Sequence, residues 1–263
     1  MKKTLLPPRS IPQDIPSEFM RLIGGADVYD SSCSPEARVY FIDRDGGYYL
    51  KHSAVGTLKK EAELNSYFHK KGLGPEVLGY ISADCDWLLT RSVIGEDCTH
   101  SLYLSEPKRL CDLLAKKLRE LHELSACDCP VQNRMDSYFS LAEENFRAGR
   151  YDTSYFTDIY KDASADEIHA TLMDGKGILN SRVLLHGDYC LPNIILDDWR
   201  FSGFIDLGNG GVGDRHIDLY WGAWTLNFNL KTDSYRERFF DAYGRDKIDA
   251  EAIKTVAAAE VFG

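Results

Sequence analysis

Residues 184–196 read LLHGDYCLPNIIL, and residues 204–208 read FIDLG. Three polar side chains here stand at the ends of apolar strands: Asp188 ends one predicted strand, Asn193 opens the next, and Asp206 ends a third. This pattern is expected to bring two carboxylates and one amide oxygen to a shared cleft. Phosphoryl transfer needs such a set, because one carboxylate accepts the proton of the attacking hydroxyl while an amide and a second carboxylate hold magnesium on the phosphates.

The spacing from Asp188 to Asn193 equals that of the Asp-x-x-x-x-Asn catalytic loop of protein kinases, and residues 206–208 stand where those enzymes have Asp-Phe-Gly. A bland alternative is that Asp188 caps a turn and that Asp206 is an ordinary surface carboxylate. The complete set of residues, with both strands and both spacings, favours the catalytic interpretation.

A phosphate-binding lysine is predicted at Lys51, which ends a strand over residues 47–51. A carboxylate on the helix predicted over residues 57–71 must hold such a lysine in place, and Glu61 is the best partner, with Glu63 as the alternative. A lone strand lysine is more often a solvated end, but the position of Lys51 between a hairpin and a helix favours a functional role.

The loop over residues 31–35, which contains Ser34, precedes the first predicted strand. Its hydroxyls and backbone N–H groups are suited to cover phosphates, although the loop equally fits a plain connection because it lacks the Gly-x-Gly-x-x-Gly form. No Walker sequence occurs, which excludes a P-loop kinase.

Two parts of different character follow each other along the chain. Residues 38–94 read mainly as strands around a hairpin turn at Asp45-Gly46, followed by a helix. After a linker near residues 90–96, helices are predicted from an N-cap at Ser105 through Leu121, and over 136–148, 165–173, 214–226, 233–243 and 249–261, with a capping box at Ser164 and Glu167. The sequence therefore predicts an α+β fold with a small β-rich N-lobe (residues 1–94) and a larger helical C-lobe (residues 95–263).

Composition narrows the class of partner and the compartment. The formal charge of −10 argues against nucleic acid as a partner. The sequence contains no run of eighteen apolar residues, so no membrane-spanning helix is predicted. The seven cysteines do not have the spacing of a zinc site and include no C-x-x-C pair, so scattered reduced thiols and a cytoplasmic location are expected.

At these residues the sequence resembles the aminoglycoside phosphotransferases, and in particular their 3′-phosphotransferase branch. Agreement in chain length extends nearly from end to end. The matching stretches are Tyr49-Leu50-Lys51, the linker after Leu88-Leu89, Leu121-His122, Asp128-Cys129-Pro130, residues 133–136 and residues 186–218.

The resemblance implies a protein-kinase-like fold of two lobes and an enzyme that phosphorylates an aminoglycoside hydroxyl with Mg²⁺ and ATP and so confers resistance, with GTP left open. Position by position, it implies the following roles: Asp188 as catalytic base, Asn193 and Asp206 as magnesium ligands, Lys51 with Glu61 on the phosphates, Tyr49 against adenine, Arg91 and Val93 as linker positions that read the adenine edge, and His186 as a scaffold residue.

The departures from the family fall on the substrate side. The branch ends in an acidic tail whose terminal carboxylate contacts substrate amines; here Glu260 matches, but Ala259 replaces an acid, Gly263 displaces the carboxylate, and Asn209 replaces an arginine. The acidic insert over residues 151–166 contains Asp158, which fits either the wall of a cationic pocket or a solvated loop.

Three alternatives remain at this point. A kinase with the same fold and mechanism could act on a metabolite such as choline, an amino alcohol or a sugar. A non-catalytic nucleotide-binding module would predict loss of Asp188, Asn193, Asp206 or Lys51, and all four are present. A hydrolase would require water to reach the phosphates. The expected partner is a small cationic molecule, and the expected state is a monomer or weak dimer.

Overall fold

The computed structural model describes residues 4–5, 14–33, 37–151, 160 and 162–263, so that the expectations for Ser34 and Asp158 fall outside the described residues. The chain forms two compact units. The first unit comprises residues 1–100 and 192–209, and the second comprises residues 101–191 and 210–263. The sequence predicts a single boundary near residue 94, whereas residues 192–209 group with the N-terminal part of the chain.

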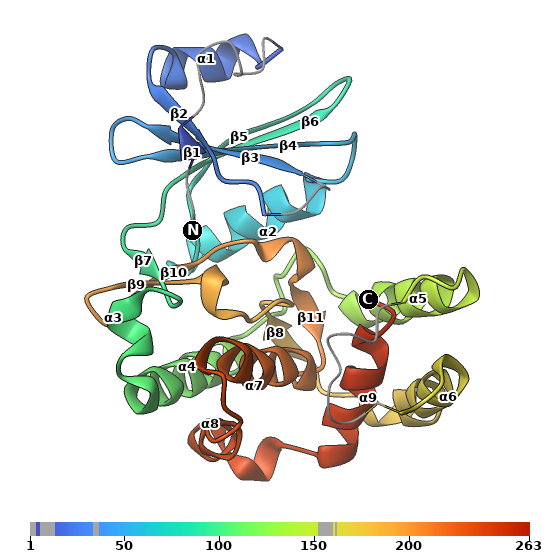
Figure 1. The fold of residues 1–263 in the computed structure, drawn as a ribbon. Coiled ribbons are helices and arrows are strands. Elements are labelled where there is room, and N and C mark those ends of the chain that lie inside the picture. Colours follow the sequence, from blue (N-terminus) through green and yellow to red (C-terminus); the bar gives the residue numbers. More distant parts are fainter. Residues whose placement is uncertain (1–3, 6–13, 34–36, 152–159, 161) are drawn as a thin grey trace. The chain divides into compact units, whose positions relative to one another are not determined.

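The first unit is built on an antiparallel sheet of six strands within the described residues, in the order β1-β2-β3-β4-β6-β5 (Figure 1). The strands are β1 (Thr4–Leu5), β2 (Asp27–Asp30), β3 (Arg38–Asp43), β4 (Tyr48–Ser53), β5 (Val77–Ser82) and β6 (Asp86–Arg91). The predicted hairpin is confirmed: β3 and β4 pair with Val39 opposite Lys51, and the turn between them places Asp45, Gly46 and Gly47 at positive φ. β4 therefore lies inside the sheet, between β3 and β6.

One helix covers each face of this sheet. Strand alternation directs Tyr48 and Leu50 to one face, where they join an apolar cluster with Phe19 and Ile23 of α1 (Ser17–Ile23). The other face carries Lys51 and packs against α2 (Lys59–Lys70). Burial of apolar side chains on both faces fixes the register of β4, because a slip of one residue would exchange its two sets of side chains.

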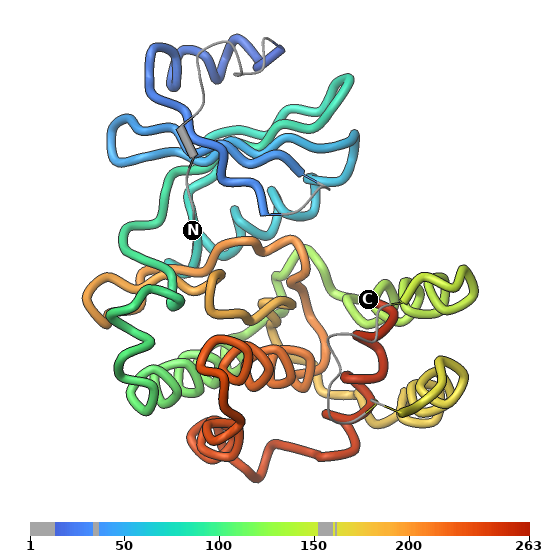
Figure 2. Tube along the Cα trace, in the orientation of Figure 1, coloured from blue at the N-terminus to red at the C-terminus, as the bar shows by residue number. Residues whose placement is uncertain are grey.

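A second, smaller sheet in the first unit joins segments far apart in the sequence. It contains β7 (Glu96–Asp97), β9 (Ile194–Asp197) and β10 (Arg200–Phe204), with β7, drawn in green, beside β9, drawn in orange (Figure 2). The Phe204 N–H donates to the Leu73 carbonyl at 2.8 Å, and the Phe204 ring lies edge-on to Phe68 of α2. These contacts attach the β9–β10 hairpin to α2, and a 3₁₀ turn, η4 (Leu207–Asn209), follows it.

The second unit is mainly helical. Its helices are α3 (Ser101–Leu104), α4 (Pro107–His122), α5 (Arg134–Arg147), α6 (Ala165–Gly175), α7 (His216–Leu230), α8 (Arg236–Tyr243) and α9 (Ala250–Glu260), and its short strands are β8 (Val183–Leu185) and β11 (Gly211–Gly213). Single 3₁₀ turns occur in this unit at η2 (Lys176–Ile178) and η5 (Arg245–Lys247), and a further one, η3 (Leu191–Asn193), begins at its residue Leu191 and continues into the first unit. α7 lies against α4, α8 and α9, so it occupies the centre of this unit.

Every helix expected between residues 57 and 261 is present. The predicted capping box is confirmed, with the Ser164 side chain accepting from the Glu167 N–H. The predicted N-cap at Ser105 is wrong: Glu106 occupies the cap position, because α4 begins at Pro107, whose missing N–H suits the first helical residue. The elements α1 and β2 are not among those that the sequence predicts. No helix among the described residues is both long and apolar enough to span a bilayer.

The attachment of the β9–β10 hairpin predicts a specific sensitivity at Gly74. A Cβ there would come within 3.0 Å of the Phe68 side chain and 3.2 Å of Leu207. We expect Gly74→Val to lower the free energy of unfolding by about 1–3 kcal/mol in urea titrations, because it overpacks this contact. Gly177→Val is the matched control, since nothing lies within 4 Å of a Cβ at that position. Equal losses in both variants would contradict the assignment.

Candidate functional site

The candidate site of the first unit is built around a lysine that pairs with two carboxylates. The Lys51 Nζ, on β4, lies 3.0 and 2.8 Å from the two carboxylate oxygens of Glu61, in the first turn of α2. It also lies 2.9 Å from Asp206 Oδ1. The sequence prediction of Glu61 as the partner of Lys51 matches this pairing, whereas Glu63 points to solvent.

The electrostatic balance of this group favours a permanently charged lysine. Burial opposes the charge, but the carboxylates of Asp206 and Glu61 outweigh it and raise the pKa of Lys51 above its ordinary value. Glu61 is almost fully buried, while the Asp206 side chain remains 53% exposed. Asp206 is thus the carboxylate of the pair that retains access to solvent and to ligands.

The backbone at Asp206 explains how its side chain reaches Lys51. Asp206 follows β10 with φ of 57°, a left-handed conformation that aspartate tolerates better than most side chains. The chain then turns so that Leu207 is fully buried and Gly208 lies against Glu61, where a Cβ would come within 3.6 Å of the Glu61 side chain. η4 is therefore packed on α2, which fixes the start of the turn that carries Asp206.

Asn193 is tied to the same place by the β9–β10 ladder. Ile194 pairs with Phe204, and one residue beyond, the Ile205 N–H donates to the Asn193 carbonyl at 3.0 Å. Asn193 therefore directly precedes β9, and Asp206 follows β10 by two residues, so both lie at the open end of the same hairpin. An amide oxygen and a partly exposed carboxylate are the oxygen ligands that Mg²⁺ prefers, so these two residues fit a magnesium ion.

The three residues predicted to contact adenine have different surroundings. Tyr49 shares the face of β4 that carries Lys51, and burial, with Asp97 and Glu96 nearby, raises its pKa to about 12. Val93 lies against Gly203. The Arg91 N–H donates to the Glu76 carbonyl, and its guanidinium reaches the Glu76 carboxylate.

In the second unit, a buried carboxylate holds the loop that contains Asp188. Asp218, on α7, is fully buried and accepts hydrogen bonds from the backbone N–H groups of His186 at 2.8 Å and Gly187 at 2.7 Å. Gly187 has φ of 87°, which a residue with a Cβ rarely adopts. The Asp188 N–H faces His186 Nδ1 at 3.3 Å, in agreement with a scaffold role for His186.

A histidine and a tyrosine complete this buried network. His122 Nε2 lies 3.1 Å from Asp218, and His122 Nδ1 lies 2.8 Å from the Tyr243 hydroxyl. Burial lowers the pKa of His122 despite the opposing effect of Asp218. A neutral ring that donates from Nε2 to Asp218 and accepts from Tyr243 satisfies all three groups.

Sequence reasoning had placed His122 and Asp218 in matching stretches without giving them a role. The signal was present: Asp218 is a single carboxylate between Ile217 and Leu219 in an apolar helix. A charge in that setting needs a buried partner.

Glu260, the matched acid of the C-terminal helix, lies in a polar cluster of the second unit. It accepts from the Tyr138 hydroxyl at 2.7 Å and from Trp221, and buried Arg134 interacts with it through charge. Burial, together with a smaller effect of the charge of Asp188, raises the pKa of Glu260 to about 7, although Tyr138, Arg134 and Trp221 act to lower it. The second unit therefore brings Asp188 and Glu260 into electrostatic range of each other, with aromatic side chains around Glu260.

Comparisons with known proteins agree with this chemistry. Residues 34–254 match the sequence profile of the phosphotransferase enzyme family. A protein of Lactococcus lactis named "Probable aminoglycoside 3'-phosphotransferase" is 49% identical over 252 residues, which cover 95% of this chain and 96% of that protein.

Solved structures show the same fold. A structure of an aminoglycoside phosphotransferase from Streptomyces rimosus has a TM-score of 0.79 and 26% identity, covering 93% of this chain and 95% of the other. A structure of that protein with ADP and streptomycin has a TM-score of 0.73 and 26% identity, covering 86% and 90%. The expected kinase-like α+β fold class and the resemblance to aminoglycoside phosphotransferases are therefore confirmed.

The Lys51–Glu61 pair predicts separable effects on stability and on catalysis. Lys51→Met should lower the free energy of unfolding by about 3 kcal/mol, because it leaves Glu61 buried without its cation. It should also lower kcat by about 10²–10³-fold. In Lys51→Met/Glu61→Gln, stability should largely return, since no uncompensated charge is buried, while turnover stays low. Recovery of turnover in the double variant would contradict a role for Lys51 in phosphate binding.

The neutral state of His122 predicts how stability depends on pH. The pKa of His122 is lower in the folded protein than in the unfolded chain, where a histidine has a pKa of about 6.5. As the pH falls below 6.5, His122 therefore binds a proton in the unfolded chain before it does so in the folded protein. The contribution of His122 is then complete above pH 6.5 and decreases by up to about 1.4 kcal/mol per pH unit below it. Urea titrations between pH 7.5 and 5 should show this slope in the wild type and a shallower one in His122→Gln. Identical slopes would show that His122 is not held neutral.

Proposed function

The chain belongs to the phosphotransferase enzyme family, and from this premise we propose that it transfers the γ-phosphoryl group of ATP to a hydroxyl of an aminoglycoside antibiotic. The observation that carries the proposal is the Lys51 ammonium paired with Glu61 and Asp206, with Asn193 on the same hairpin as Asp206. A dianionic phosphate on the drug would remove its charge complementarity to RNA, so the reaction confers resistance.

The first unit carries the nucleotide side of the reaction. Lys51, held by Glu61, neutralises charge on the phosphates, and Tyr49 contributes an aromatic ring on the same face of β4 for the base. Asn193 and Asp206 would hold Mg²⁺, which when bound neutralises phosphate charge as the γ-phosphoryl group leaves. To bind Mg²⁺, Asp206 would give up its contact with Lys51. Asp206 is suited to this exchange because its side chain is more exposed than that of Glu61.

The second unit carries the acceptor side. Asp188 orients the acceptor hydroxyl and takes its proton, and its loop is held by Asp218 through the N–H groups of His186 and Gly187. Because Asp218 is buried and fully hydrogen-bonded, the loop does not have to reorganise before the reaction.

Recognition of a cationic acceptor falls to Glu260. Its raised pKa means that, without a ligand, the carboxylate is about half protonated near neutral pH. An ammonium group placed beside it would draw off that proton and gain a charge-assisted hydrogen bond. The overall charge of −10 also favours association with polycations.

A second candidate, a kinase of choline or another amino alcohol, is favoured by the aromatic side chains of α7. Trp221 bonds to Glu260 and contacts Trp224 edge-on, and the Trp224 ring stacks on Phe228 at 4.9 Å. A carboxylate next to an indole is the combination that binds quaternary ammonium groups by cation–π contact.

We place the protein in the cytoplasm. All seven cysteines lie in the described part of the chain and are free thiols, in agreement with a reducing compartment.

The test is Mg²⁺-dependent ATP turnover with kanamycin, neomycin, streptomycin, choline or no acceptor. The proposal expects turnover that rises with an aminoglycoside and stays at background without an acceptor. Turnover with choline alone would establish the second candidate. Equal turnover in every tube would instead show a hydrolase and contradict both.

The two aspartates predict different kinetic defects. Asp188→Ala should lower kcat by about 10²–10⁴-fold and leave nucleotide affinity nearly unchanged, because Asp188 acts on the acceptor hydroxyl. Asp206→Ala should weaken binding of the Mg²⁺–nucleotide complex as well as turnover. Fluorescent-nucleotide titration together with steady-state kinetics separates them. Near-normal turnover in Asp188→Ala would rule out its role as base.

Glu260 predicts the pH dependence of acceptor binding. With a pKa of about 7, Glu260 is ionised above that pH and protonated below it, so acceptor affinity in the wild type should fall as the pH drops from 8 to 6. Glu260→Gln should raise KM by about tenfold at pH 8 and lose this dependence, because the amide does not titrate. Titration of the drug's own amines affects both proteins equally. If KM depends on pH in the same way in the wild type and in Glu260→Gln, Glu260 does not bind the acceptor.

A further inference from the structure

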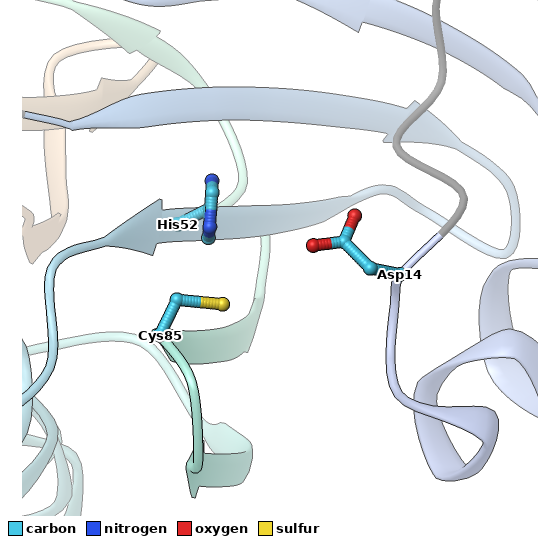
Figure 3. A group of neighbouring side chains, drawn as sticks. All are labelled: Asp14, His52 and Cys85. Atoms are coloured by element: carbon cyan, nitrogen blue, oxygen red, sulfur yellow. The ribbon is translucent and has the colours of Figure 1, made fainter.

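Three metal-binding side chains converge in the first unit, on the face of the sheet opposite Lys51. They are Asp14, which precedes α1, His52 on β4, and Cys85 between β5 and β6 (Figure 3). One ring nitrogen of His52, the Cys85 sulfur and one carboxylate oxygen of Asp14 all lie within 4.8 Å of one another. The face assignment follows from strand alternation, since Leu50, two residues before His52, is buried in the α1 cluster.

The geometry distinguishes a metal site from a catalytic relay. In a Cys-His-Asp relay the histidine must use opposite ring nitrogens, one for the thiol and the other for the carboxylate. Here a single ring nitrogen is close to both partners, and the carboxylate and the sulfur are close to each other. Figure 3 shows all three side chains facing one common space. Three donors around one point is the arrangement of ligands around an ion.

Neighbouring side chains position His52 and Cys85 without occupying their metal-binding atoms. The His52 ring stacks on Trp87 at 4.2 Å with an interplanar angle of 21°, which fixes its orientation. Cys85 packs against the apolar cluster that includes Trp87. Among the described residues the structure gives the side chains of Asp14, His52 and Cys85 no hydrogen bond or ion pair, so the lone pairs of these side chains are available to a ligand.

We propose that Asp14, His52 and Cys85 form a site for one zinc-type divalent ion. Thiolate, imidazole and carboxylate together suit Zn²⁺, whereas Mg²⁺ selects oxygen ligands only. Metal–ligand distances of about 2.0–2.3 Å require tetrahedral donors to lie roughly 3.5 Å apart, so binding requires the donors to approach one another by at most about 1.3 Å. Water completes the four-coordinate shell.

Such an ion would join three segments of the first unit. Asp14 belongs to the segment before α1, His52 to a central strand, and Cys85 to the β5–β6 turn. An ion that binds only the folded arrangement stabilises it by mass action, so it would fasten the segment leading into α1 to the sheet. It would act on stability and leave turnover unchanged, because none of the three residues belongs to the nucleotide or acceptor side.

Titration of the full-length, metal-free protein with Co²⁺ tests the site, in millimolar Mg²⁺ to occupy the oxygen-ligand site. We expect one equivalent of Co²⁺ to produce a near-ultraviolet sulfur-to-cobalt charge-transfer band that Zn²⁺ abolishes. Cys85→Ser should lose the band, and His52→Gln and Asp14→Asn should bind Co²⁺ at least tenfold more weakly. Cys33→Ser is the matched control, since it removes an exposed thiol of the same unit and should keep the band.

Thermal unfolding gives the second measurement. Zn²⁺ should raise the Tm of the wild type and of Cys33→Ser, but not that of Cys85→Ser, whose metal-free Tm should equal the wild-type value. A wild type without the charge-transfer band, or a band that persists in Cys85→Ser, would overturn the proposal. ATP turnover by Cys85→Ser should match the wild type, so failure here is separable from failure of the proposed kinase activity.

Discussion

The first unit depends on one ammonium group that satisfies two carboxylates. Glu61 is buried, and its charge is tolerable only because Lys51 lies within 3.0 Å of both of its oxygens. Asp206 reaches the same ammonium from a hairpin 155 residues away in the sequence. Strand β4, helix α2 and the β9–β10 hairpin must therefore all be in place before the charges balance, so this charge cluster is a property of the folded unit and not of any local segment.

The second unit also buries a carboxylate, but it satisfies that carboxylate without a cation. Asp218 is a fully buried carboxylate that is satisfied by two backbone N–H groups and by a neutral histidine, not by a cation. The loop that carries Asp188 is thereby fixed, while Asp188 itself remains partly exposed. In both units a buried acid orients a neighbouring group, and a second acid, Asp206 or Asp188, is more exposed than the first.

Local strand and turn patterns, together with the spacing of the motif residues, predicted much of this arrangement. Strand alternation and the Asp-Gly turn placed Lys51 on a strand followed by the helix of Glu61, and the spacing of Asp188, Asn193 and Asp206 indicated the chemistry. Contacts between distant segments were not predictable, because no periodicity records that Asp206 meets Lys51 or that Tyr138 bonds to Glu260. Ser105 failed as an N-cap because a proline two residues later set the helix start.

Mass spectrometry of the acceptor after incubation with ATP and Mg²⁺ tests the central claim most directly. We expect an aminoglycoside to gain the mass of one phosphoryl group with wild-type protein and not with Asp188→Ala, in step with ADP release. An unmodified aminoglycoside alongside ADP and free phosphate, or a product formed equally well by Asp188→Ala, would contradict it.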